Sequence, residues 1–298
     1  MQRIYLQGAN ARLSAVSLGD PTNPAVVAVH GLRDHALGLY ELLEPLAEHY
    51  YVVALDLRGH GHSDKTHTYT MIQFMADLKA LFDHFAFEHA RLIGHSLGGH
   101  IAMRFAATYP ERVSQLVLLD GMGPPGNPDG VSVIDVQARL KEGIQTVLAI
   151  TGQRRAISNA AEAKARLQKN NPLMSEALAE LIVSEGVEPH PDGGVMWRWE
   201  SAVNMIWQTF SHHETEALIP LIESPVLILT GDRGLDYWVA MRPQQSDESF
   251  YEAELLRREA LFNSGRHVVI ENAGHMLHYD QPLAVYNEVA GFFTAAAS

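Results

Sequence analysis

A serine between two glycines is the residue in this sequence best suited to covalent chemistry. Ser96 stands in Gly94-His95-Ser96-Leu97-Gly98, which matches the pattern G-x-S-x-G. An apolar stretch precedes this segment and a helical pattern follows it, so the glycines permit a sharp strand-to-helix turn. Such a turn exposes the serine hydroxyl at its apex, near the positive end of the helix. We therefore predict that Ser96 is a nucleophile, which needs a base and a site that accepts negative charge.

The candidate base is His275, in the segment Gly274-His275-Met276 that follows the last predicted strand. In triads built around G-x-S-x-G the chain order is serine, acid, histidine, so the histidine comes last. His267 lies inside the predicted strand and His278 lies beyond the turn, which makes both less suitable. The sequence thus predicts that His275 takes the proton of Ser96.

Two backbone N–H groups are candidates for binding the negative oxygen of a tetrahedral intermediate. One belongs to Leu97, the residue after the nucleophile. The other belongs to Leu32, in the loop His30-Gly31-Leu32 that follows an apolar strand. We expect His30 to brace this loop and not to react.

The elements that must position these residues are short apolar runs that alternate with amphipathic helical patterns. Runs without polar alternation indicate strands buried on both faces. They are found at Ala25–Val29, Tyr51–Leu55, Ala90–Ile93, Val113–Leu119, Pro225–Leu229 and Arg266–Ile270. We predict an α/β fold with a mostly parallel, doubly wound sheet, opened by a hairpin over residues 3–18. Ligands bind beyond the carboxyl ends of such strands, where His30, Ser96 and Asp120 fall.

The pattern changes after residue 121. A Gly/Pro-rich linker, Met122–Gly130, leads into helical patterns without a buried-strand run. We therefore predict a helical cap over residues 122–219, inserted into a core domain formed by residues 1–121 and 220–298. Its helices are predicted by apolar stripes over Val136–Leu148, Leu173–Ile182 and Trp199–Phe210. The aromatic residues of the third stripe either seal the cap onto the core or line an acyl or alcohol pocket.

The composition excludes several classes of function. The 298 residues are 47% hydrophobic and 19% charged, with 22 Lys and Arg against 35 Asp and Glu, a net charge of −13. This acidic balance disfavours nucleic acids and anionic membranes as partners. The chain has no cysteine and hence neither disulfides nor thiolate metal ligands. Without a secretory apolar core or a membrane-length apolar run, we expect a cytoplasmic monomer or homodimer that does not insert into membranes.

Four motifs in order give the chain a family resemblance. They are Val29-His-Gly31, Asp56-Leu-Arg-Gly-His-Gly-His-Ser63, Gly94-His-Ser-Leu-Gly98 and Gly274-His275. Together they resemble the α/β-hydrolase fold with a helical cap. Within that superfamily the chain is most similar to the serine hydrolase-like group, partly through the cap stretch that begins at Arg166. The resemblance covers nearly the whole chain, but the fold hosts several reactions. Serine at position 96 argues against dehalogenases and epoxide hydrolases of this fold, which carry aspartate there.

The acid of the triad departs from the usual family pattern. After the penultimate strand the family typically shows G-x-x-D, whereas this chain has Gly231-Asp-Arg-Gly234. Asp120, at the end of the strand after the nucleophile helix, is one alternative, since some members of the fold take their acid there. Asp236 is a second alternative if the loop is locally longer, and Asp232 is a third. An acid in any of these places would orient His275 and stabilise its protonated form.

These features predict a serine hydrolase that cleaves a small, largely apolar carboxylic ester, or a related acyl compound, and needs neither cofactor nor metal. The expected partner is thus a small-molecule ester, with Ser96 and His275 as catalytic residues. Two alternatives remain open at this stage. One is a C–C bond hydrolase or cofactor-free perhydrolase with the same triad, and the other is a non-catalytic ligand receptor on this fold.

Overall fold

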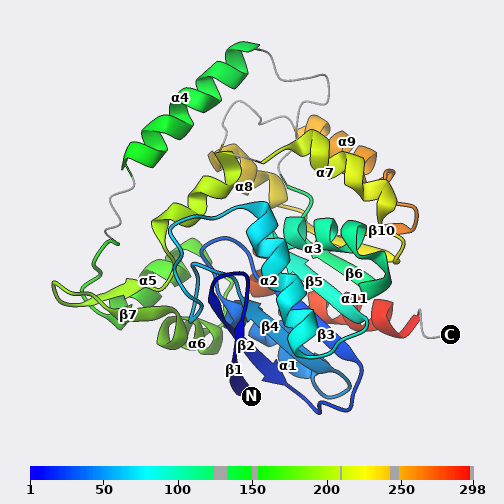
Figure 1. The fold of residues 1–298 in the computed structure, drawn as a ribbon, viewed down its shortest axis with the longest axis horizontal. Helices are drawn as coiled ribbons and strands as arrows, with labels where there is room; N and C mark the ends of the chain where they lie inside the picture. The colour runs from blue at the N-terminus through cyan, green and yellow to red at the C-terminus, as the bar shows by residue number, and fades with distance from the viewer. Residues whose placement is uncertain (124–132, 150–153, 209, 242–247, 296–298) are drawn as a thin grey trace.

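A mixed sheet forms the centre of the molecule, with the strand order β1-β2-β4-β3-β5-β6-β9-β10. The structure is a computed structural model that describes residues 1–123, 133–149, 154–208, 210–241 and 248–295 (Figure 1). Its strands are β1 (Gln2–Gln7), β2 (Arg12–Leu18), β3 (Ala25–Val29), β4 (Tyr51–Asp56), β5 (Ala90–His95), β6 (Val113–Leu119), β9 (Val226–Gly231) and β10 (Gly265–Ile270). β2 is antiparallel to both of its neighbours and all other pairs are parallel. The predicted fold and the predicted opening hairpin are confirmed.

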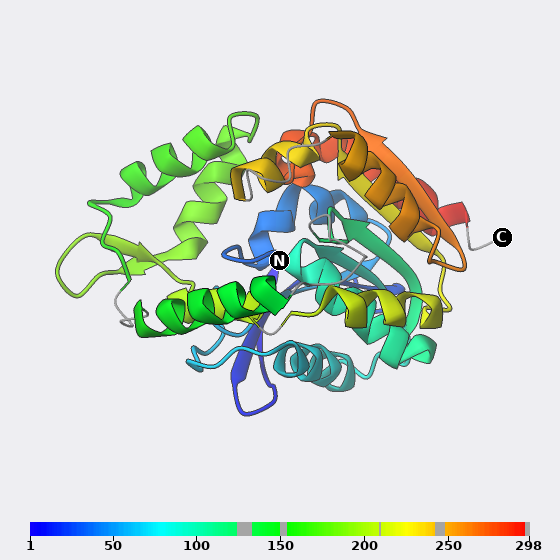
Figure 2. The ribbon, with the colours of Figure 1, turned by 90° about the horizontal axis from the view of Figure 1, so that it is seen from above.

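Helices cover both faces of this sheet, because its central strands are apolar on both sides. One face carries α2 (Met71–His84), α3 (Leu97–Thr108) and α9 (Glu248–Glu259), and η2 (Pro110–Arg112) connects α3 to β6. The other carries η1 (Ala36–Leu39), α1 (Tyr40–Leu46), α10 (Leu277–Asp280) and α11 (Pro282–Ala295). Seen from above, α2 and α11 lie on opposite sides of the strands (Figure 2). No helix among the described residues has both the length and the apolar character that a membrane crossing requires.

The segment between β6 and β9 adds no strand to the main sheet within its described residues. It contains α4 (Val133–Ala149), α5 (Ala160–Asn170), α6 (Glu176–Gly186), β7 (Val187–Pro189), β8 (Val195–Trp197), η3 (Ser201–Gln208), α7 (His212–Leu218) and η4 (Ile219–Leu221). Most of the predicted linker, residues 124–130, lies outside the described residues. β7 and β8 pair as an antiparallel hairpin that the sequence patterns do not indicate. α7 and η4 pack against α3, which joins the end of this segment to the sheet-bearing part.

α4 lies at the periphery of the molecule, beside η3 (Figure 1). The helical period predicted for this stretch is present, yet its apolar side chains face outward. They are exposed by half or more of their surface at Leu140, Ile144, Val147 and Leu148. The side chain of Val136 lies outside the described part of the chain.

A buried ion pair fixes the loop after β4 to α2 and to the opening hairpin. Arg58 Nε lies 2.6 Å from Asp77 Oδ2, and Arg58 Nη2 lies 2.7 Å from Asp77 Oδ1. Both side chains are almost fully buried. Arg58 also donates to the carbonyl of Ala9 at 2.7 Å, and Asp77 accepts the N–H of Ala9 at 3.0 Å. The mutual hydrogen bonds of the two charged side chains, together with those to the Ala9 backbone, therefore satisfy this buried pair.

We predict that Asp77→Ala lowers the free energy of unfolding by about 3–5 kcal/mol, because it leaves the Arg58 guanidinium buried without its counter-charge. Urea denaturation measures this change. Asp83→Ala is the matched control on the same helix, since Asp83 is half exposed and pairs with Lys79. Such a surface pair contributes about 0–1 kcal/mol. Equal losses for the two variants would contradict the structural role given to the buried pair.

Candidate active site

Ser96 occupies a strained turn between β5 and α3. Its backbone angles are φ 50° and ψ −115°, a region that residues with a side chain rarely adopt. The N–H of Ser96 donates to the carbonyl of Leu119 at 3.1 Å, so the end of β6 holds the turn in place. The turn therefore projects the serine side chain beyond the carboxyl end of the sheet, as the motif predicts.

Two glycines are required by the close approach of α3 to the strands. A Cβ at Gly98 would lie 2.2 Å from the carbonyl oxygen of Val29, and one at Gly94 would lie 2.5 Å from the carbonyl oxygen of Gly98. Neither separation is possible for a real side chain. The two glycines of the motif thus let the nucleophile helix begin directly against β3 and β5.

The structure brings Ser96, His275 and Asp120 together. His275 Nε2 lies 3.0 Å from Ser96 Oγ, and His275 Nδ1 lies 2.5 Å from Asp120 Oδ2. All three side chains are buried. Asp120 follows β6 with a φ of 42°, and its N–H donates to the carbonyl of Leu229 at 2.8 Å. In this geometry Nδ1–H donates to Asp120, which leaves the lone pair of Nε2 for the serine proton.

The other two candidate acids lie elsewhere. Asp236 is exposed in the first turn of α8 (Gly234–Met241), and no described hydrogen bond joins it to His275. Asp232 accepts the N–H groups of Asn272 at 2.9 Å and Ala273 at 3.0 Å. These hydrogen bonds, that of Asn272 first, lower the pKa of Asp232. Asp232 therefore braces the loop that carries His275 and does not contact its imidazole.

Two further hydrogen bonds, to Asp280 and from His95, hold the loop that carries His275. The N–H of Gly274 donates to Asp280 Oδ2 at 2.8 Å, and His95 Nε2 lies 3.0 Å from the carbonyl oxygen of His275. His95 directly precedes Ser96 in the chain. The backbones of the two reacting residues are thus linked by one side chain.

Tyr237 is a site residue that the sequence patterns missed. Its ring stacks on the imidazole of His275, with ring centroids 3.9 Å apart and an angle of 9° between the planes. Trp238 meets the same imidazole edge to face at 5.6 Å. Their position in the sequence could have predicted this contact, because Tyr237 and Trp238 follow the loop in which the family usually carries its acid.

The two predicted oxyanion donors remain available. Among the described residues, neither the N–H of Leu97 nor the N–H of Leu32 donates a hydrogen bond to protein. His30 braces the Leu32 loop as expected, since its Nδ1–H donates to the carbonyl of Gly31 at 2.7 Å and its Nε2 accepts the N–H of Leu57 at 3.0 Å. Burial lowers the pKa of His30 to about 3, so this ring stays neutral.

The aromatic residues of the predicted stripe Trp199–Phe210 contact two parts of the molecule, helix α3 and the loop after β3. Trp207 and Phe210 meet the His100 ring of α3 edge to face, with ring centroids 5.9 and 4.6 Å from that of His100. They therefore pack the segment between β6 and β9, called the inserted segment below, against the sheet-bearing part. Trp199 instead lies against Arg33, whose guanidinium carbon is 5.3 Å from the centre of the indole ring. Arg33 directly follows Leu32.

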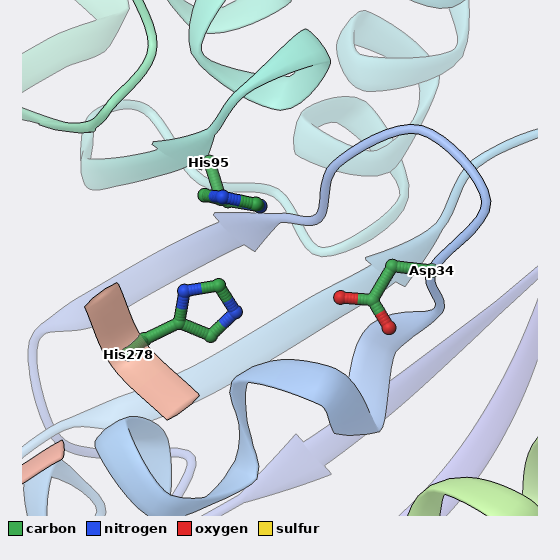
Figure 3. A group of neighbouring side chains, drawn as sticks. All are labelled: Asp34, His95 and His278. Atoms are coloured by element: carbon green, nitrogen blue, oxygen red, sulfur yellow. The ribbon is translucent and has the colours of Figure 1, made fainter. Parts of the chain in front are cut away.

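Asp34, His95 and His278 are the described residues whose types and positions could hold a metal ion. They come from the loop after β3, the end of β5 and α10, and point toward one another (Figure 3). One ligand atom of each lies within 4.8 Å of the others, and zinc accepts such a ligand set. Asp34 also accepts the hydroxyl of Tyr279 at 3.0 Å, while His95 holds the His275 carbonyl. Two of the three side chains are therefore already engaged in joining the segments around the site.

Burial keeps the imidazoles beneath the site neutral. It lowers the pKa of His278 to about 3 and that of His95 well below its usual value. Neither ring then carries a positive charge that would repel a proton on His275. The arrangement can therefore generate an alkoxide-like serine, pass its proton to one imidazole, and bind a developing oxyanion.

Known proteins share this architecture. A family model described as alpha/beta hydrolase fold matches residues 24–282. A Serine hydrolase-like protein of Mus musculus is 25% identical over 289 residues, which cover 92% of this chain and 89% of that protein. Esterase YbfF of Escherichia coli (strain K12) is 25% identical over 267 residues, which cover 90% of this chain and 92% of that protein.

A solved structure agrees with these relatives in fold. The thioesterase domain from the curacin biosynthetic pathway superimposes with a TM-score of 0.82 at 23% identity, covering 97% of this chain and 99% of that one. The family model spans well over half of the sequence, from the turn before β3 to the start of α11. The chain therefore belongs to the alpha/beta hydrolase fold family.

Proposed function

We propose that this protein is a serine hydrolase that cleaves a small, largely apolar carboxylic ester through an acyl-enzyme. One observation carries the proposal: the His275 imidazole lies between the Ser96 hydroxyl and the Asp120 carboxylate at hydrogen-bonding distance from both. Family membership supports hydrolase activity. An esterase is among the similar sequences and a thioesterase domain among the similar structures.

The first half of the proposed reaction transfers the acyl group to the enzyme. Ser96 Oγ attacks the ester carbonyl carbon while its proton moves to His275 Nε2. The tetrahedral intermediate places its negative oxygen toward the N–H groups of Leu97 and Leu32. It collapses as the bond to the leaving oxygen breaks, and His275 returns the proton to that oxygen. An alcohol departs and an ester of Ser96 remains.

The second half hydrolyses this ester. A water molecule gives a proton to His275 and attacks the acyl carbon, which forms a second tetrahedral intermediate. Breaking the bond to Ser96 Oγ releases the carboxylic acid, and the proton on His275 restores the serine hydroxyl. Asp120 supports each protonated state of the imidazole through Nδ1–H. One oxyanion donor contributes about 3–4 kcal/mol to such reactions, so the Leu32 loop matters as much as the nucleophile turn.

Aromatic side chains beside the reacting groups support an apolar substrate. Tyr237 and Trp238 lie against His275 from α8, and Trp199 lies near the Leu32 loop through its contact with Arg33. Ligand sites are mostly apolar with a few placed polar groups, and this set has that character.

Ser96→Ala should lower kcat for p-nitrophenyl butyrate by about 1,000-fold or more, because the variant lacks the attacking oxygen. The same variant should not be labelled by a fluorophosphonate probe, which reacts with activated serines. Ser114→Ala is the control, since Ser114 is an exposed serine at the beginning of β6, away from the carboxyl ends of the strands. It should retain both labelling and turnover.

Retained turnover in Ser96→Ala would contradict the acyl-enzyme mechanism. A wild-type protein without activity on p-nitrophenyl esters of increasing chain length, yet thermally stabilised by them, would favour the receptor alternative.

Substitution of Asp120 and of Asp236 separates the roles of these two candidate acids. We predict that Asp120→Asn lowers kcat by about 10,000-fold, because an amide disfavours the tautomer of His275 that accepts the serine proton. Asp236→Asn removes the same charge from an exposed position and should change kcat by less than about twofold. Circular dichroism and thermal unfolding check that both variants fold. A larger effect at Asp236 would reassign the acid.

A further inference from the structure

Arg33 occupies an unusual position beside the proposed oxyanion loop. It directly follows Leu32, is exposed, and has a φ of 65°, which a residue with a side chain adopts only at a cost. The inserted segment fixes its guanidinium. Nε and Nη2 both donate to Asn204 Oδ1, at 3.0 and 2.7 Å, and the Trp199 ring lies beneath the guanidinium at 5.3 Å. The positive φ and the contacts with Asn204 and Trp199 together fix the position of the Arg33 guanidinium. Such a fixed, exposed cation indicates a binding role.

The charge of Arg33 is not neutralised by the protein. Within the described part of the chain, no carboxylate forms an ion pair with it, and its partner Asn204 is neutral. This is notable in a chain of net charge −13. Several other cations on or against the inserted segment pair with carboxylates: Arg3 with Glu185, and Lys65, Arg154 and Arg198 with Glu188. Arg104 instead donates to Ser211 and Thr215 of that segment, but it is buried, whereas Arg33 is exposed. Nη1 and the second hydrogen of Nη2 therefore remain as donors for a ligand.

Arg33 is also adjacent in the chain to a proposed oxyanion donor, because it directly follows Leu32. Burial raises the pKa of the Tyr237 phenol, and the positive charge of Arg33 acts against that rise. Tyr237 stacks on His275, so Arg33 acts on the aromatic wall of the proposed site. Its neighbour Leu32 supplies one of the two N–H groups that face the oxyanion. A substrate bound to that N–H would lie beside the loop that carries Arg33.

We propose that Arg33 binds a carboxylate carried by the substrate, which makes the preferred ester a half-ester of a short dicarboxylic acid. This inference rests on the proposed function and narrows its substrate class. A guanidinium offers a carboxylate two parallel N–H donors, a geometry that a lysine cannot copy. Asn204 and Trp199 hold the guanidinium in advance, so little side-chain entropy is lost when the carboxylate binds.

The test compares two esters that differ in the terminal charge: the mono-p-nitrophenyl ester of adipic acid and p-nitrophenyl hexanoate. We expect the wild type to have a higher kcat/KM for the half-ester than for hexanoate. Arg33→Gln should lower the ratio of these two kcat/KM values by about 10- to 100-fold, the usual contribution of a hydrogen bond to a charged group. The half-ester to hexanoate ratio of Arg33→Lys should lie between those of the wild type and Arg33→Gln. The preference should also weaken as ionic strength rises.

Arg266→Gln is the matched control, because it removes the same charge from an exposed arginine at the amino end of β10, paired with Glu288. It should leave the ratio unchanged. A wild-type ratio near one, or equal changes in Arg33→Gln and Arg266→Gln, would overturn the assignment while leaving the esterase proposal standing.

A second measurement separates the two proposals if neither ester is turned over. Adipate should raise the thermal unfolding temperature of Ser96→Ala, and the rise should disappear when Arg33→Gln is added. That result supports the carboxylate site even though the esterase proposal has failed. No stabilisation by adipate would overturn the carboxylate site itself.

Discussion

The parallel register of β5, β6 and β9 is the constraint on which the site depends. The N–H of Ser96 donates to the carbonyl of Leu119, and the N–H of Asp120 donates to the carbonyl of Leu229. Each residue thus takes the first position beyond its strand and is anchored to the next strand across. Both have a positive φ, which costs about 1–3 kcal/mol per residue and persists only where the surroundings determine the backbone. The buried strands supply that determination, so the two side chains leave the sheet at one level.

In the proposed triad the acid is Asp120, directly after β6, and the segment after β9 makes other contacts with the His275 loop. Asp232 receives two N–H groups of the loop that carries His275, and Tyr237 covers the face of the imidazole. The loop after β9 therefore holds the backbone just before His275, and helix α8 covers the His275 ring. This division explains how a chain without the usual acid position still fixes the orientation of His275. Position in the family pattern alone points to the segment with Asp232 and Asp236, whereas the hydrogen bond to the imidazole comes from Asp120.

The features that the sequence predicted are those that local patterns determine. The Ser96 turn follows from two glycines, and the buried strands follow from uninterrupted apolar runs. The choice between Asp120 and Asp236 depends on distances between loops far apart in the chain, which no local pattern contains. The stacking of Tyr237 on His275 is nonlocal in the same way. The three-residue strands β7 and β8 are too short for alternation to reveal them.

The α4 stripe shows a further limit of periodicity. A period near 3.6 predicts that apolar side chains share one face of a helix, and they do. It does not say what that face contacts, and Leu140 and Leu148 are largely exposed. Burial is decided by the arrangement of whole elements, so the helix could be predicted and its environment could not.

The inserted segment and the proposed site depend on each other through charge. Glu185 and Glu188 of this segment pair with Arg3 and Lys65 of the core, which attaches it beside the strands through ion pairs. Beside Leu32 the contact is of a different kind, because Arg33 meets a neutral amide and an indole ring. A carboxylate at that point would have neutralised the guanidinium and repelled an anionic ligand. The neutral contact holds the guanidinium without neutralising it, so in the proposed site the inserted segment leaves a positive charge beside the Leu32 loop.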